Sequence, residues 1–224
     1  MSTPAEKHAL RVSGETSLTL VAFIVFFTAL LAWVYLFSQP VIEQSTRNEK
    51  LVVLNQILPA NLYNNDPLAD SLTLPPEPQL GTKTASTVYR ARNNGKDSAL
   101  VMDVIAPDGY SGPIKLLVAF SANGQVLGVR AVEHKETPGL GDYIDPRKDK
   151  NKTSPWIDQF NNVPLSLSNK DWHVKKDGGD FDAYAGATVT PRAVVKAVHR
   201  AQEFVMDNRK VLFTRSTTQN SANP

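Results

Sequence analysis

The sequence predicts an α+β protein: a single N-terminal transmembrane helix followed by one domain in which helices pack against an antiparallel sheet. Three observations predict this fold. Residues 18–37 are almost uninterruptedly apolar, residues 84–133 alternate strand-like segments with turn residues, and residues 191–208 repeat apolar residues at helical spacing. A domain of about 140 residues is large enough for a single hydrophobic core.

The apolar run has the length of a membrane span. It contains no charged residue and only two threonines, and twenty helical residues reach ~30 Å, the thickness of the hydrocarbon core. A cleavable signal peptide is the alternative, but residues 36–40 contain no small-x-small cleavage site. We therefore expect a short cytoplasmic N-terminus over residues 1–16 and a transmembrane helix over residues 17–38.

Residues 39–83 predict a helix that leaves the membrane and then a connector. Pro59 ends the helix, and three prolines between residues 72 and 80 favour an extended chain. The polar segment 211–224 is expected to be a flexible tail.

The domain itself is expected to span residues 84–210. Its predicted strands are residues 84–92, 99–106, 114–121 and 125–133. Asn94-Gly95 and Asn123-Gly124 are hairpin signals, so strands that are consecutive in the chain should pair. The last helix should begin at Pro191 with Thr190 as its N-cap, and it should bury an apolar stripe on the sheet.

Composition argues against several classes of function. The chain has no cysteine, which excludes disulfides and thiolate-bound iron–sulfur clusters. Its net charge of +2 argues against nucleic acid as a partner, and the one basic run, residues 147–152, is expected to be a solvated loop. The four histidines lack metal-ligand spacing, so no metal site and no catalytic triad is predicted; His199 is expected on the exposed side of the last helix.

The segment Asp182-Ala-Tyr-Ala-Gly-Ala-Thr-Val-Thr-Pro191 is the most informative part of the chain. It places Thr188 beside the start of the predicted helix, where unpaired N–H groups and the helix dipole favour an anion. Arg192 in the first turn opposes that dipole, so its position indicates a bound phosphate or carboxylate. The alternative is a Gly-Ala turn before an ordinary capped helix.

A second motif is His134-Lys-Glu-Thr-Pro-Gly-Leu-Gly-Asp142. Pro138 fixes φ, while Gly139 and Gly141 allow positive φ and a close approach of the backbone to another surface, such as a planar ring. Leu140 could then lie against that surface. A tight surface turn is the alternative interpretation.

Both motifs resemble the FMN-binding domains of the Rnf and Na⁺-pumping NADH:quinone oxidoreductase complexes. Asp-x-x-x-Gly-Ala-Thr is similar to the flavinylation motif of that family, and the Pro-Gly-Leu-Gly loop is similar to the branch formed by the Rnf G subunits, as are residues 109–115 and 156–160. The resemblance implies FMN joined to Thr188 by a phosphodiester, and a separate flavin transferase that Asp182 helps to engage. Ala185 stands where the family usually carries Ser or Thr.

The resemblance also implies a flavin environment built from both motifs. A flat ring with apolar faces prefers aliphatic and aromatic partners, and Glu136 could accept a hydrogen bond from a ring N–H or cap its turn. The implied cofactor-binding residues are Thr188, Gly186, Ala187, Thr190, Arg192, Gly139, Leu140, Tyr184 and Glu136.

The function that the resemblance implies is electron transfer. The chain would be one component of a membrane-bound Rnf complex that moves electrons between ferredoxin and NAD, coupled to Na⁺ or H⁺ translocation, with no complete active site of its own. It would lie in the inner membrane beside other subunits, with its domain in the periplasm, although flanking basic residues are too evenly balanced to fix the orientation. Two alternatives stay open: an anchored assembly or binding module without flavin, and the C subunit of the Na⁺-pumping complex.

Overall fold

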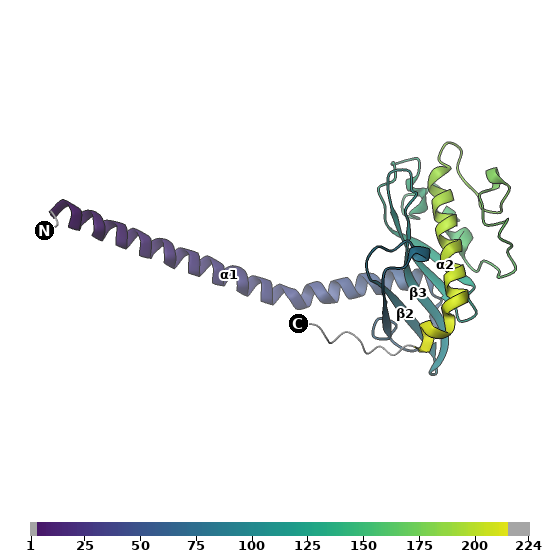
Figure 1. The fold of residues 1–224 in the computed structure, drawn as a ribbon, viewed down its shortest axis with the longest axis horizontal. Coiled ribbons are helices and arrows are strands. Elements are labelled where there is room, and N and C mark those ends of the chain that lie inside the picture. Colours follow the sequence, from purple (N-terminus) through teal and green to yellow (C-terminus); the bar gives the residue numbers. More distant parts are fainter. Residues whose placement is uncertain (1–3, 215–224) are drawn as a thin grey trace. The chain divides into compact units, whose positions relative to one another are not determined.

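The computed structural model describes the backbone of residues 4–214, and side chains at residues 17, 18, 20–35, 37 and 50–214. The chain divides into two units, Met1–Lys50 and Leu51–Pro224. Helix α1 (Pro4–Ile57) contributes to both (Figure 1).

The first unit consists of the part of α1 up to Lys50. Its described apolar side chains are exposed, and those of Phe23, Ile24 and Trp33 each expose more than half of their area. Within the described residues, no helix was found that is both long and apolar enough to cross a membrane.

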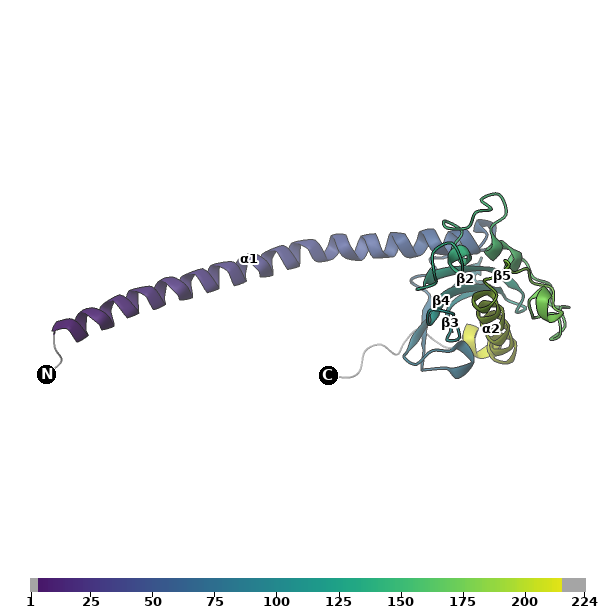
Figure 2. The same cartoon turned by 90° about the horizontal axis from the view of Figure 1, so that it is seen from above.

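The second unit is built on a five-stranded antiparallel sheet in the order β1-β2-β3-β4-β5. Figure 2 shows this unit from above. The strands are β1 (Ser71–Leu74), β2 (Ser86–Asn93), β3 (Lys96–Ala106), β4 (Ile114–Ser121) and β5 (Val126–Glu133). Each strand pairs with the next one in the chain; Met102 of β3, for example, lies between Val88 and Val118. The predicted antiparallel sheet is confirmed.

Both predicted hairpin turns are present. Asn94 and Gly95 have φ of 50° and 75°, the left-handed conformations that a two-residue hairpin between twisted strands needs. Gly124 has φ of 92°, and a Cβ there would lie 2.3 Å from the sulfur of Met206. Glycine therefore lets the β4–β5 turn lie against the last helix.

Strand β1 differs from the sequence prediction, which placed an extended connector there. Leu72 and Leu74 are buried and pair with Val88 and Ser86 of β2. A four-residue edge strand followed directly by prolines gives little period-two signal, and prolines themselves argue against a strand. Strand β1 belongs to the compact unit that starts at Leu51.

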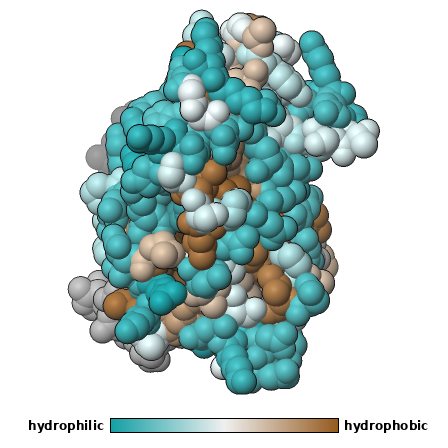
Figure 3. Space-filling view, turned by 90° about the vertical axis from the view of Figure 1, so that its right-hand side faces the viewer, coloured by the Kyte–Doolittle hydropathy of each residue, from teal (hydrophilic) through white to brown (hydrophobic). Residues whose placement is uncertain are grey.

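Helices cover both faces of the sheet. Helix α2 (Val189–Thr214) lies across one face (Figure 1). Its predicted apolar stripe is buried there. The end of α1 covers the other face, where Leu54, Ile57 and Leu58 pack in a second core cluster with Val101 and Ala119. Sequence reasoning found the stop at Pro59 but not this packing. The side of the molecule shown in Figure 3 is mostly hydrophilic, with hydrophobic side chains gathered near its centre.

Candidate functional site

The two sequence motifs meet at the first turn of α2. Thr190 and Glu136 are 54 residues apart in the chain, yet the Thr190 hydroxyl donates a 2.5 Å hydrogen bond to Oε2 of Glu136. Both side chains are buried, at 2% and 4% exposure. The backbone N–H of Ser111 donates to Oε1 of Glu136 at 3.1 Å. The loop after β3 and the first turn of α2 therefore both donate to one carboxylate from the loop after β5.

Gly141 permits the closest approach between these loops. The sequence allowed either a positive φ or a close approach at this position, and its φ is −88°. A Cβ at Gly141 would instead lie 2.5 Å from the hydroxyl of Thr190 and 2.7 Å from Oε2 of Glu136. Gly139 does have a positive φ, 76°, and its N–H donates to the Asp142 carboxylate at 2.8 Å.

Replacing Gly141 with Ala should lower the free energy of unfolding by about 1–3 kcal/mol, because the new methyl group would force the Thr190–Glu136 pair apart. Urea denaturation measures the change. Gly139→Asn is the matched control: nothing lies within 4 Å of a Cβ there, and Asn accepts a left-handed φ. Equal stability of Gly141→Ala and wild type would contradict the packing described.

Helix α2 begins at Val189, two residues earlier than predicted. The carbonyl of Thr188 accepts a hydrogen bond from the N–H of Arg192 at 3.3 Å, which makes Thr188 the residue that caps the helix. The N-cap prediction for Thr190 is wrong, because its hydroxyl is engaged by Glu136. Thr188, the predicted attachment residue, is half-buried.

Arg192 lies between Thr188 and a carboxylate. Its Nε and Nη2 donate to the two oxygens of Asp177 at 2.5 and 2.6 Å, and its Nη1 donates to the Thr188 hydroxyl at 3.3 Å. The hydrogen bonds from Arg192 hold the pKa of Asp177 below its usual value. The sequence predicted a bound anion as the counter-charge of Arg192, whereas in this structure Asp177 supplies one.

The Asp182 end of the motif has a hydrogen-bonded backbone and an exposed side chain. Its N–H donates to Gln159 at 2.8 Å, and its carbonyl accepts from the indole N–H of Trp156 at 2.6 Å. Its carboxylate is two-thirds exposed and pairs with Lys175 at 2.7 Å. Gly186, further along, has φ of 83° and open space around it.

Tyr184 lies against Tyr143, with ring centroids 4.2 Å apart. The Tyr184 hydroxyl donates to Asp149 at 2.8 Å, and the Tyr143 hydroxyl donates to the carbonyl of Ala187 at 3.0 Å. Burial and the hydrogen bond to Asp149 raise the pKa of Tyr184 to about 12, so its phenol stays protonated at neutral pH. Tyr184 and Leu140 are both partly exposed; their contact with a flavin ring stays a prediction.

Asp149 is a site residue that sequence reasoning missed. It lies in the run expected to be a solvated loop, but it is fully buried. It accepts hydrogen bonds from the N–H groups of Trp156 and Asn151 at 2.6 and 2.9 Å, in addition to the Tyr184 hydroxyl. Burial raises the pKa of Asp149, but these hydrogen bonds outweigh it and hold the pKa below its usual value. Its burial could not be predicted from the sequence, because an aspartate among lysines and arginines is typical of an exposed loop.

This domain, with its antiparallel sheet, helix α2 and the loops that meet at the start of α2, is an FMN-binding domain. Residues 109–203 match the family described as FMN-binding domain, and residues 12–57 match the RnfG N-terminal region.

Relatives that align with nearly the whole chain show which group of FMN-binding proteins it belongs to. The chain is 43% identical to the G subunit of the ion-translocating oxidoreductase complex of Vibrio cholerae serotype O1 (strain M66-2), over 91% of this chain and 94% of the relative. It is equally similar to the G subunits of Vibrio atlanticus (strain LGP32), over 92% and 96%, and Shewanella baltica (strain OS223), over 87% and 90%. The chain belongs to the family of G subunits of ion-translocating oxidoreductase complexes, as the resemblance implied.

Proposed function

We propose that this chain relays electrons within a membrane-bound Rnf-type complex through FMN joined to Thr188 by a phosphodiester. Family membership supports FMN and the role within a multi-subunit complex. The observation that supports Thr188 is its place directly before α2, with a guanidinium nitrogen of Arg192 3.3 Å from its hydroxyl. Unpaired N–H groups at a helix start, together with a guanidinium, favour a phosphate there.

The protein's part is to position and tune the cofactor. FMN supplies the exchange of one or two electrons, which links one-electron to two-electron carriers. Arg192, held by Asp177, would donate from Nη1 to the phosphodiester, and the exposed faces of Leu140 and Tyr184 would lie against the ring. Glu136 and Thr190 would act indirectly, because their buried hydrogen bond fixes the two motifs to each other.

The wider reaction belongs to the whole complex. On this proposal electrons pass between ferredoxin and NAD, coupled to Na⁺ or H⁺ translocation, and other membrane subunits bind this chain. A flavin transferase would attach the flavin during maturation. The exposed carboxylate of Asp182 on a fixed backbone would suit recognition by that enzyme.

A denaturing gel tests the covalent link. Chain produced together with a flavin transferase should carry flavin fluorescence after denaturation, and its intact mass should exceed that of the polypeptide by one esterified FMN. A bare polypeptide mass would refute the covalent link. If the folded chain also released no flavin on precipitation, the alternative of an assembly module, which the departure at Ala185 favours, would replace this proposal.

Residues 17–38 are proposed to anchor the chain in the inner membrane, with the domain in the periplasm. The support is the exposed apolar surface of α1 between Leu18 and Phe37, because apolar surface left in water costs about 25 cal/mol per Å². The chain should resist extraction from membranes at alkaline pH, and protease added to spheroplasts should digest the domain. Release by alkali would contradict the anchor, and protection in spheroplasts would contradict the orientation.

A further inference from the structure

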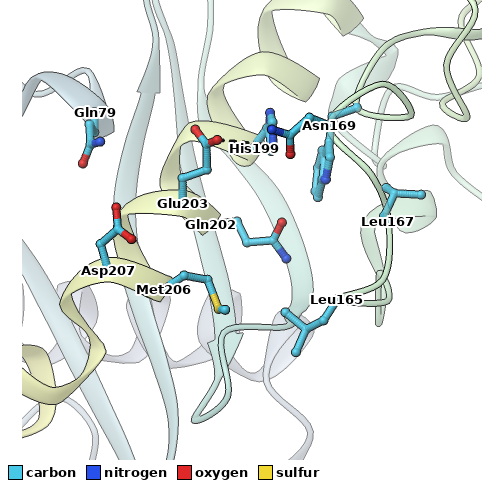
Figure 4. Close-up of a pocket in the computed structure, with 10 residues that line it drawn as sticks. Gln79, Leu165, Leu167, Asn169, His199, Gln202, Glu203, Met206 and Asp207 are labelled. Carbon is cyan, nitrogen blue, oxygen red and sulfur yellow. Dashed lines mark ion pairs between the residues drawn. The ribbon is translucent and has the colours of Figure 1, made fainter.

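A groove of about 400 Å³ lies along α2, and none of its lining residues belongs to the candidate FMN site. Figure 4 shows its two walls: α2 on one side and the loop of residues 165–172 on the other. The wall formed by α2 includes His199, Gln202, Glu203, Met206 and Asp207, and the loop wall includes Leu165, Asn169 and Trp172.

The groove carries two carboxylates without a cation to balance them. Glu203 and Asp207 are four residues apart on α2, so their like charges are neighbours and destabilise the helix. Among the described residues, Asp207 has no ion pair, and the one recorded partner of Glu203 is His199 at 3.8 Å. No Lys or Arg lines the groove.

His199 does not neutralise this charge at neutral pH. The sequence placed it on the exposed side of the helix, but it is half-buried and stacks on Trp172, with ring centroids 5.0 Å apart and planes 11° from parallel. Burial lowers the pKa of His199, so its ring is mostly uncharged at pH 7. The net charge of the groove is therefore negative.

A hydrogen-bond acceptor in the groove also lacks a donor. Gln202 is only 8% exposed, and its amide nitrogen donates to the carbonyl of Gly124 at 3.3 Å. Its amide oxygen accepts no hydrogen bond from any residue that the structure describes. That oxygen is not among the fully buried side-chain atoms without a partner, so a donor that enters the groove can reach it and form a hydrogen bond.

The remaining surface of the groove is apolar. Leu165 and Met206 are each exposed by more than two-fifths, and Leu165 extends from the loop toward α2 (Figure 4). Met side chains adapt to partners of different shape, which is why they recur at binding surfaces. Carboxylates, a free acceptor and apolar walls together suit a cationic donor flanked by an apolar side chain.

We propose that this groove binds a lysine- or arginine-bearing segment of another protein of the complex, with an apolar side chain of that segment between Leu165 and Met206. The cationic N–H groups would donate to Glu203, Asp207 and the amide oxygen of Gln202. The chain's own residues 215–224 fit poorly, because they contain a single basic residue and no large apolar one. This inference rests on the proposed function, which supplies the partner proteins.

Photo-crosslinking in the assembled complex tests the groove. A benzoylphenylalanine at Asn169, on the rim, should crosslink in native membranes to a Lys- or Arg-containing peptide of another protein of the complex, identified by mass spectrometry. Glu203→Gln combined with Asp207→Asn removes both charges, while Glu203→Asp combined with Asp207→Glu keeps them. Two rim ion pairs correspond to roughly a 3- to 30-fold change in affinity. The crosslink yield should fall by a comparable factor in the neutral variant and persist in the charged control.

Several outcomes would overturn the proposal. These are a crosslink to a second copy of this chain or to its own residues 215–224, no crosslink at all, or the same crosslink yield in the neutral double variant as in the wild type. Flavin fluorescence of the same samples separates the two proposals. A flavinylated chain without the crosslink would overturn the groove alone, and a crosslinked chain without flavin would overturn the FMN proposal alone.

Discussion

Replacing Thr188 with Val should remove covalent flavin from the chain completely. Valine keeps the shape of threonine but lacks the hydroxyl oxygen that would form the ester bond. The fold should survive, because the one side-chain hydrogen bond of Thr188 recorded among the described residues is the 3.3 Å contact from Arg192. Fluorescence of the denatured chain on a gel, together with its intact mass, measures the loss.

Thr190→Val is the matched control for this experiment. It should keep the covalent flavin but lower the free energy of unfolding by about 1–3 kcal/mol, because Oε2 of Glu136 would lose its buried donor. Flavin that persists in Thr188→Val would place the attachment elsewhere. Thr190 would be the next candidate, although its 2% exposure makes it a poor substrate for another enzyme.

The sequence predicted those elements whose conformation depends on residues close together in the chain. The Asn94-Gly95 turn follows from the left-handed φ that only a few residues adopt easily, and the stripe of α2 follows from its period. Strand β1 was missed because it is held in the sheet by Leu72 and Leu74, whose burial depends on β2. So short a strand carries too little pattern to reveal a partner further along the chain.

The start of α2 shows how a long-range contact can defeat a local rule. Thr190 before Pro191 is a strong capping signal, but the Thr190 side chain bonds to Glu136 from another loop, and Thr188 caps the helix instead. The sequence predicted a close approach at Gly141 but not its partners, the side chains of Thr190 and Glu136. Each motif could be recognised in the sequence, but the hydrogen bond that joins them, between Thr190 and Glu136, could not be predicted.

The charges around the site were equally hidden. Arg192 was recognised as an unusual cation in a first helical turn, and the structure places it beside the Thr188 hydroxyl. Its partner Asp177 lies 15 residues before it, at the end of the 3-10 helix Lys175–Asp177, which no sequence pattern had indicated. The sequence therefore showed that a cation lies at the start of α2, but only the structure shows which carboxylate pairs with it.

Asp149→Ala should lower the free energy of unfolding by about 2–5 kcal/mol, the largest effect on stability that we expect in the domain. The change leaves the buried N–H of Trp156 and the part-buried hydroxyl of Tyr184 without their acceptor; an unsatisfied buried donor costs about 1–3 kcal/mol, and one that water can reach costs less. Urea denaturation measures it. Asp180→Ala, at an exposed carboxylate, should change stability by less than about 0.5 kcal/mol.

The same carboxylate should make this difference depend on pH. Because folding lowers the pKa of Asp149, its charge-dependent stabilisation is complete above the ordinary Asp value of ~3.9 and is lost as pH falls through the lower folded value. Other acidic groups are common to wild type and Asp149→Ala, so their effects cancel in the difference. The gap between the two unfolding curves should therefore narrow in acid; a gap as wide in strong acid as at pH 7 would mean that the Asp149 charge contributes nothing, and that shape and packing alone hold Tyr184 and Trp156 in place.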